Sequence, residues 1–108
     1  MVYNSCMNRK KRTDRNHVIY QLTCLDTGES YIGITVVRGR AIKKSVETRF
    51  QQHCYRAEVQ TKEWNLCTAL RQFDNWVHDV IEVVRGKKEA HARERELISL
   101  FQPELNTQ

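Results

Sequence analysis

Three consecutive segments near the start of the chain carry most of the fold information: HVIYQLTC at residues 17–24, DTGE at 26–29 and YIGIT at 31–35. The first and third segments are rich in β-branched and aromatic residues, and apolar side chains in the first alternate as they do in a strand. The segment between them contains the aspartate and glycine that tight turns favour. We therefore predict a β-hairpin in which Tyr20 and Tyr31 lie near each other across the strand pair.

Two helices are expected after the hairpin. Between Val46 and Ala57 the apolar residues recur at spacings of three and four, which is the period of an amphipathic helix. Ser45 is a residue type that favours the N-cap position, so we expect this helix to begin there and to run to about Glu58. A second helical stretch covers roughly residues 64–73.

One further strand and one further helix complete the chain. The strand covers about residues 76–84, and burial on both of its faces is suggested by Val80, Ile81, Val83 and Val84. The helix is expected over about residues 88–101, and Pro103 stops it because proline has no backbone N–H to donate. The order β-β-α-α-β-α, without internal repeats, predicts a single α+β domain over residues 17–108.

The overall charge of the chain is positive. Its 108 residues include 18 Lys and Arg against 13 Asp and Glu, a net charge of +5. Such a charge favours a polyanionic partner, of which nucleic acid is the commonest, although a merely well-solvated basic surface has the same composition. No apolar run approaches the length that spans a bilayer, so we expect no membrane partner.

The four cysteines contain no Cys-x-x-Cys pair. No signal peptide indicates an oxidising compartment, so we interpret them as reduced thiols of a cytoplasmic protein. A zinc ion shared by His53 and Cys54 is disfavoured, because adjacent side chains on a helix point about 100° apart.

Basic residues are concentrated in two segments. Residues 1–16 read as an N-terminal arm with few large apolar side chains, and its basic run is Arg9, Lys10, Lys11 and Arg12. The loop after the hairpin and the start of the first helix contain Arg38, Arg40, Lys43 and Lys44. Such segments are usually solvated, and they follow phosphates when a nucleic acid is nearby. We therefore expect both segments to contact DNA.

Polar side chains also lie on the apolar faces of two expected helices. Arg49 and His53 are four residues apart, so they project together from the first helix toward the layer that it covers. Glu94 lies within the apolar stripe of the last helix, which is formed by Ala90, Leu97, Ile98 and Phe101. A carboxylate that faces a core is unfavourable unless it is paired, protonated or bound to a metal ion.

Each of these residues has a purely structural alternative. Glu94 and Arg49 would form a half-buried salt bridge without a catalytic role, and His53 would be a hydrogen-bonded core histidine. Tyr20 and Tyr31 would simply pack between strands. Taken singly, none of these residues indicates a function.

Taken together, the residues resemble the motifs of the GIY-YIG nuclease superfamily. Its first two motifs appear as Val18-Ile19-Tyr20 and Tyr31-Ile32-Gly33, with ten residues between the tyrosines. Its arginine, with a histidine four residues on, appears as Arg49 and His53. Its glutamate, with a hydrophobic pair three and four residues on, appears as Glu94, and its terminal Pro-x-x-Asn ends at Asn106. The five elements occur in family order over residues 17–106.

The resemblance implies a fold and an activity. The fold is a three-stranded antiparallel sheet flanked by three helices, and the activity is metal-dependent hydrolysis of phosphodiester bonds in DNA. It places one divalent cation, Mg²⁺ or Mn²⁺, on Glu94. Arg49 is then expected to hold the scissile phosphate, and either Tyr20 or His53 to act as general base. The remaining expected site residues are Tyr31, which would orient water or phosphate, and Asn106, which would support Glu94.

Such an enzyme could have several biological roles. We favour a stand-alone endonuclease of a phage or mobile element, of the homing type, acting on double-stranded DNA in the cytoplasm of a bacterial or phage-infected cell. A restriction-like enzyme, a repair nuclease and a non-catalytic DNA-binding module are the alternatives. An RNA-directed protein is disfavoured because no aromatic stacking platform is evident. Site preference would come from the basic segments, from a partner or from self-association as a homodimer.

Overall fold

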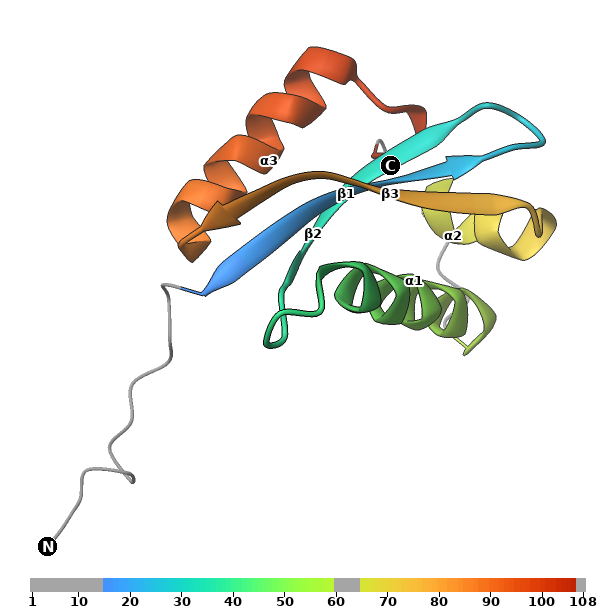
Figure 1. Ribbon diagram of the computed structural model, residues 1–108. Helices are drawn as coiled ribbons and strands as arrows, with labels where there is room; N and C mark the ends of the chain where they lie inside the picture. Colours follow the sequence, from blue (N-terminus) through green and yellow to red (C-terminus); the bar gives the residue numbers. More distant parts are fainter. Residues whose placement is uncertain (1–14, 60–64, 107–108) are drawn as a thin grey trace, which may run out of the picture.

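The structure, a computed structural model, describes residues 15–59 and 65–106; the basic run at positions 9–12 lies outside them. The elements follow the expected order β-β-α-α-β-α (Figure 1). They are β1 (Asn16–Cys24), β2 (Ser30–Val36), α1 (Ile42–Val59), α2 (Asn65–Gln72), β3 (Trp76–Arg85), α3 (Lys87–Phe101) and a 3₁₀ turn, η2 (Glu104–Asn106). The α+β class and the three-stranded antiparallel sheet are confirmed.

The predicted hairpin is formed by β1 and β2. The two strands pair in antiparallel register from His17 opposite Val36 to Thr23 opposite Ser30. In the turn between them Gly28 has φ 79°, a left-handed conformation that glycine adopts without a Cβ clash. The strand order is β2-β1-β3, so β1 is the central strand.

The sheet separates two apolar cores. Helices α1 and α2 cover one face and α3 covers the other (Figure 1). Successive side chains of a strand point to opposite faces, so β1 contributes to both cores. On the α1 side, three buried residues of β1 pack with Val46 and Leu66. The three are Val18, Tyr20 and Leu22. On the α3 side Ile19 packs with Ile32 and Leu97.

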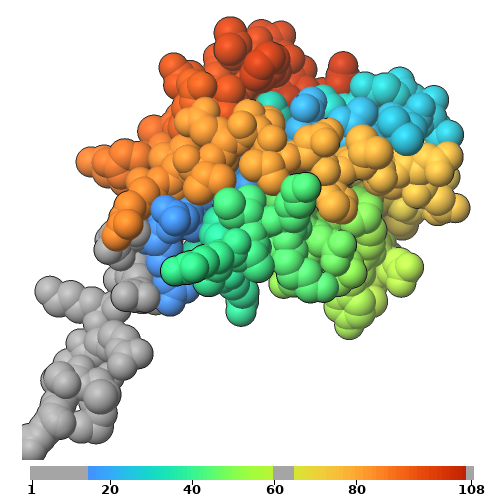
Figure 2. Space-filling model, viewed as in Figure 1, coloured from blue at the N-terminus to red at the C-terminus, as the bar shows by residue number. Residues whose placement is uncertain are grey.

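The expectation that β3 is buried on both faces is wrong. β3 is an edge strand that crosses the front of the molecule (Figure 2), and its Ile81 and Val84 are partly buried against the α3-side core. Three of its valines are more than a third exposed, namely Val77, Val80 and Val83. Helix α1 packs against the beginning of β3, where Phe50 contacts the rings of Trp76 and His78. A run of β-branched residues is typical of a buried strand, but here β1 occupies that position.

The expected N-cap of the first helix is also wrong. Helix α1 begins at Ile42, three residues before Ser45. The Ser45 hydroxyl donates a hydrogen bond to the Ala41 carbonyl (2.6 Å) and accepts one from the Arg38 backbone N–H (3.1 Å). Ser45 is therefore buried inside the first turn, where it fixes the loop between β2 and α1.

The last helix differs from its expected stripe at one position. Ala90 and Leu97 are buried as predicted, but Phe101 is 60 % exposed. The helix ends there, because Gln102 takes the left-handed conformation (φ 46°) and donates its N–H to the Ile98 carbonyl. Phe101 is thus the last residue of the helix before the chain changes direction, and its ring lies outside the core.

Two further expectations concern thiols and membranes. Within the residues that the structure describes, Cys24, Cys54 and Cys67 are free thiols, as predicted. Cys6 lies outside the described residues. In that same part of the chain, no helix combines the length and the apolar character needed to cross a bilayer.

Candidate active site

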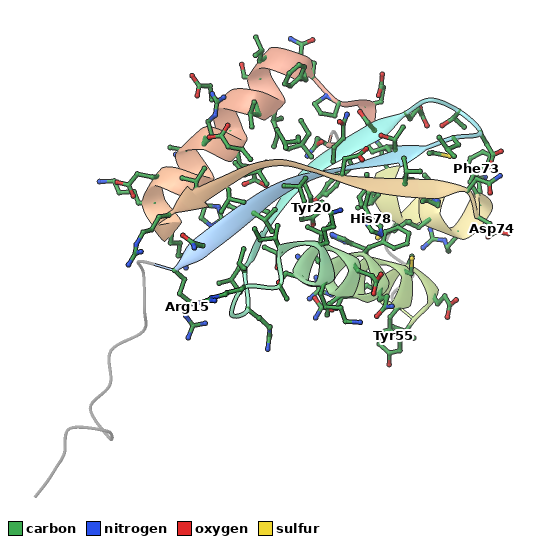
Figure 3. The ribbon with its side chains drawn as sticks, in the orientation of Figure 1. Arg15, Tyr20, Tyr55, Phe73, Asp74 and His78 are labelled. Atoms are coloured by element: carbon green, nitrogen blue, oxygen red, sulfur yellow. The ribbon has the colours of Figure 1, made fainter. Side chains whose placement is uncertain are left out.

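Three rings meet between the sheet and α1. The Tyr20 hydroxyl lies 2.9 Å from Nε2 of His53, within hydrogen-bonding distance. The Tyr20 and Tyr31 ring centroids are 6.5 Å apart, and the Tyr31 and His53 centroids are 5.6 Å apart in an edge-on arrangement. Figure 3 shows Tyr20 between the sheet and α1. The expected proximity of the two tyrosines is confirmed, and the structure adds His53 to them.

Gly33 makes this cluster sterically feasible. It lies opposite Tyr20 in the strand register. A Cβ at this position would be 2.5 Å from the Tyr20 hydroxyl and 2.8 Å from Cε2 of Tyr31. The two phenol rings therefore occupy the space above the glycine backbone, which explains why the strand needs a residue without a side chain here.

Arg49 lies one helical turn before His53 and acts on all three rings. Its positive charge opposes the rise that burial causes in the pKa of Tyr20 and Tyr31, and it adds to the fall that burial causes in the pKa of His53. Nη1 of Arg49 donates to Oε1 of Gln52 (3.1 Å), and its buried Nε has no acceptor among the described residues. An unpaired guanidinium N–H is costly to bury, so the site favours an anionic acceptor from outside the chain.

Burial determines the protonation state of His53. Burial, together with the smaller effects of the Arg49 and Arg56 charges, lowers the pKa of His53 from its ordinary value to about 4. His53 is therefore neutral at neutral pH, and one ring nitrogen is a hydrogen-bond acceptor.

Tyr20 is perturbed in the opposite direction. Burial, followed by the neighbouring Tyr31, raises the pKa of Tyr20 above its ordinary value, and the Tyr20 side chain is only 1 % exposed. Between a neutral tyrosine and a neutral histidine, the tautomer of the imidazole sets the direction of the hydrogen bond. When the single imidazole proton is on Nδ1, Tyr20 is the donor and Nε2 of His53 the acceptor.

Glu94 approaches from the α3 layer. Its side chain is 17 % exposed, and burial raises the pKa of this carboxyl, an effect partly offset by His91 at 3.5 Å. Its negative charge adds to the rise that burial causes in the pKa of Tyr31 and of Tyr20. The alternative salt bridge with Arg49 is not formed in the described part of the chain, where Glu94 pairs with His91 instead.

Asn106 binds the outer edge of β2. Its Oδ1 accepts the Ile32 N–H and its Nδ2 donates to the Ile32 carbonyl, both at 2.8 Å. A single amide thus acts as one more hydrogen-bonded neighbour of the strand, next to Tyr31. The amide of Asn106 is thus oriented by the backbone of β2, and its support of Glu94 stays a prediction.

The donor set near Glu94 determines which metal ion would fit. The described residues contain no group of three histidine, cysteine, aspartate or glutamate side chains able to hold a metal ion. A structural zinc site is therefore not formed by them. A single half-buried carboxylate suits Mg²⁺, which retains most of its water ligands, and a cation would compensate Glu94 for its lost hydration.

The basic residues expected to bind DNA separate into two groups. Arg38, Arg40, Lys43 and Lys44 are all exposed. Arg38 and Lys44 line a hollow of about 110 Å³ together with Arg49, whereas Arg40 and Lys43 do not line it.

Two residues near the site were not anticipated from the sequence. Gln52 holds Arg49 and His91 pairs with Glu94, and each lies three positions from its partner on the same helix. Residues three apart on a helix are neighbours, so this spacing was the signal that could have identified both.

Comparisons with known proteins give one match. A family model described as the GIY-YIG catalytic domain matches residues 16–107, nearly the whole chain. No curated protein matches the chain, and no solved structure matches it either.

Proposed function

Because the chain belongs to the GIY-YIG catalytic-domain family, a family of nucleases that act on DNA, we propose that it is a metal-dependent endonuclease hydrolysing phosphodiester bonds in double-stranded DNA. The observation that carries the proposal is the 2.9 Å contact between Tyr20 and His53 beside Arg49. Such a hydrogen-bonded pair moves a proton, and the adjacent guanidinium binds a phosphate. Both are needed to cut a phosphodiester.

Arg49 is the residue proposed to hold the scissile phosphate. Its planar fork of donors matches two phosphate oxygens, and Gln52 orients it from the next turn of α1. Tyr31 of β2 is proposed to orient the phosphate or the attacking water. The charge of Arg49 would offset the negative charge that grows on the phosphorus oxygens during attack.

Tyr20 and His53 are proposed to act together as the general base. The attacking water gives a proton to the Tyr20 oxygen while the Tyr20 O–H proton passes to Nε2 of His53. Tyr20 thus never becomes a free phenolate, so its raised pKa is no obstacle. A phosphate bound to Arg49 would cancel one of the two positive charges that lower the pKa of His53, making His53 a better acceptor.

Glu94 is the proposed ligand of a Mg²⁺ or Mn²⁺ ion. When bound, the ion supplies positive charge to the phosphate and to the leaving oxygen. Glu94 itself must be ionised for this role. Since burial raises its pKa, we expect cleavage to fall off at a higher pH than an ordinary carboxyl would require.

A plasmid-cleavage assay tests the proposal. In the presence of Mg²⁺ the purified protein should cut supercoiled plasmid, and addition of a chelator should stop the cleavage. Glu94→Gln should lower the rate at least about 100-fold while DNA binding without metal ion stays within about twofold of wild type. Glu89→Gln, exposed on the same helix, is the matched control and should cut normally. Cleavage by Glu94→Gln at a near wild-type rate would sink the metal assignment.

Two substitutions test the proton relay. Tyr20→Phe and His53→Ala should each lower the rate of cleavage by about 100-fold, and the double substitution should be no worse than either. Near-normal cleavage by Tyr20→Phe would instead make His53 the only base. A non-catalytic DNA-binding module would show binding without metal-dependent cleavage in wild type.

The biological task that we propose is that of a homing-type endonuclease of a phage or mobile element. Sequencing the ends of cut plasmid distinguishes it from the restriction-like and repair alternatives. One long preferred site supports homing, a short recurring site supports restriction, and cutting without preference supports neither. The same ends show whether one strand or both are cut, and paired cuts would support a homodimer, because one site cuts one strand per event.

A further inference from the structure

A hollow lies beside the proposed active site, between the end of β2 and the first turns of α1. Its volume is about 110 Å³, several times the roughly 10–15 Å³ that one water molecule needs. The lining residues are Thr35, Val36, Arg38, Ala41, Lys44, Ser45, Thr48, Arg49 and Gln52. Three of these side chains are cationic, four are neutral and polar, and none is acidic. A concave surface of this kind attracts an anion.

The backbone around the hollow is fixed in place. Ser45 bonds to both Ala41 and the Arg38 N–H, so it ties the loop to the first turn of α1. Lys44 bonds to Glu47 at 3.3 Å, but both side chains are largely exposed (72 % and 46 %). An exposed pair of this kind is weak, so a phosphate oxygen can replace Glu47 as the partner of Lys44.

Arg49 lies between the hollow and the ring cluster. It lines the hollow, and its charge acts on Tyr20, Tyr31 and His53. A DNA strand whose scissile phosphate meets Arg49 on the side of the rings would bring its next phosphate to the other side of the same guanidinium.

We propose that this hollow binds the internucleotide phosphate next to the scissile one on the strand that is cut. The inference rests on the proposed nuclease function and adds a second phosphate subsite to it. Arg38 and Lys44 supply the charge, Thr48 supplies a hydroxyl, and Arg49 is shared by the two phosphates. The subsite would fix the register of the strand, so that one defined bond faces Tyr20 and His53.

A charge-matched pair of variants tests the subsite. Thr48→Glu places a carboxylate in the hollow, and Gln51→Glu places the same charge at an exposed position of α1 that does not line it. Binding to a short DNA duplex is measured by fluorescence anisotropy without metal ion. Thr48→Glu should weaken binding at least about tenfold and Gln51→Glu at most about twofold. Equal effects of the two variants would overturn the proposal.

A second pair keeps the test valid if Thr48→Glu folds poorly. Arg38→Gln with Lys44→Gln removes two charges from the hollow, and Arg40→Gln with Lys43→Gln removes two from the same segment outside it. The first pair should lower the dependence of log Kd on log salt by about 1, as expected for one lost phosphate, and by more than the second pair does. The same slope in both double variants would contradict a built subsite.

The position and source of the phosphate are tested with modified duplexes. A neutral methylphosphonate is placed on either side of the mapped cut, and duplexes are made with and without 5′-phosphates. Wild type should lose affinity with the methylphosphonate on one side only, and Thr48→Glu should show no further loss there. A loss that depended only on the terminal phosphate would overturn the internucleotide assignment.

These results are separable from the proposed function. The first two comparisons need no metal ion and no cleavage, so a protein that binds through the hollow but never cuts would refute only the endonuclease proposal. A protein that cuts, but whose hollow variants match their controls, would refute only the subsite.

Discussion

At the scale of single residues, the site depends on how three rings share the space above one glycine. Tyr20, Tyr31 and Gly33 belong to the two strand motifs, and His53 comes from α1. The phenol of Tyr20 meets Nε2 of His53 only because Gly33 leaves room for the ring. Gly33 thus contributes to the site because it has no side chain, and this role depends on the position of the opposite strand.

Gly33→Ala should therefore damage the site without destroying the fold. The new Cβ would be 2.5 Å from the Tyr20 hydroxyl, so the ring must move away from His53. We expect a loss of about 1–3 kcal/mol in the free energy of unfolding, as for overpacked cores, and a lower cleavage rate. Urea unfolding and plasmid cleavage measure the two effects. Tyr20→Phe, which keeps the ring, is the comparison, and unchanged cleavage by Gly33→Ala would contradict the steric argument.

His53 should make stability depend on pH. Its pKa is lowered to about 4 in the folded protein, below the ordinary value of 6.5. Between these values the unfolded chain binds a proton that the folded protein does not. The stabilising contribution of His53 to the free energy of unfolding is therefore present above pH 6.5 and is lost as pH falls toward 4.

The size of this effect can be measured by urea unfolding. From about pH 7 to about pH 5 the contribution of His53 should fall by up to about 2 kcal/mol, and His53→Gln should remove that part of the slope. The same pH slope in wild type and in His53→Gln would show that His53 titrates normally.

At the scale of elements, the outer edge of β2 is completed by a side chain. β2 has β1 on one side only, and the chain passes its other side after α3, where η2 places Asn106 against Ile32. Leu105 of η2 is buried with the α1-side core. The end of the chain thus holds the strand that carries Tyr31, although it contributes no strand of its own.

Substitution of Asn106 should therefore loosen β2. Asn106→Ala removes two hydrogen bonds of 2.8 Å, with an expected cost of about 2 kcal/mol in the free energy of unfolding. Hydrogen exchange of the Ile32 amide should accelerate as well. Asn106→Asp keeps the acceptor for the Ile32 N–H but loses the donor, so its Ile32 amide should remain better protected than in Asn106→Ala. Equal protection in wild type and in Asn106→Ala would show that the edge does not depend on this amide.

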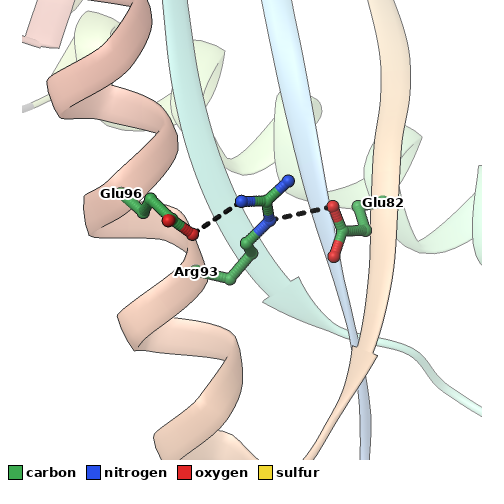
Figure 4. Close-up of polar contacts among 3 residues, drawn as sticks. All are labelled: Glu82, Arg93 and Glu96. Atoms are coloured by element: carbon green, nitrogen blue, oxygen red, sulfur yellow. Dashed lines mark hydrogen bonds and ion pairs between the residues drawn. The ribbon is translucent and has the colours of Figure 1, made fainter.

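At the scale of the whole molecule, the candidate site combines groups from two layers. Arg49 and His53 come from α1, whereas Glu94 comes from α3 on the other face of the sheet. Arg93, next to Glu94, bonds to Glu82 of β3 (3.0 Å) and to Glu96 of its own helix (2.6 Å), as Figure 4 shows. These contacts join α3 to the edge strand, and we expect them to help to position Glu94.

Removing this link should affect the metal requirement more than the fold. Glu82→Gln weakens the contact to Arg93, so we expect the Mg²⁺ concentration for half-maximal cleavage to rise several-fold. Circular dichroism should remain unchanged, because surface ion pairs add little stability. Asp79→Asn, exposed on the same strand, is the matched control. An identical Mg²⁺ requirement in both variants would show that Arg93 does not position Glu94.

Sequence patterns predicted the elements and most candidate residues, because these depend on local chemistry. Strand alternation, helical spacing and turn residues indicated the hairpin, the helices and their order. Helical spacing also placed Arg49 and His53 on one face. The patterns could not show that β3 lies at an edge or that Phe101 is exposed, because burial depends on which elements lie opposite.

The hairpin with its two tyrosines, the residues of the five motifs and the basic character of the chain all follow from local sequence patterns. Which of these residues meet depends on how the elements pack together. This packing paired Tyr20 with His53 and tied Asn106 to Ile32 across 74 positions, and it placed Arg38 and Lys44 around one hollow with Arg49. The physical reason is that local periodicity states which face a side chain occupies, whereas a contact also requires the neighbouring layer to be in place.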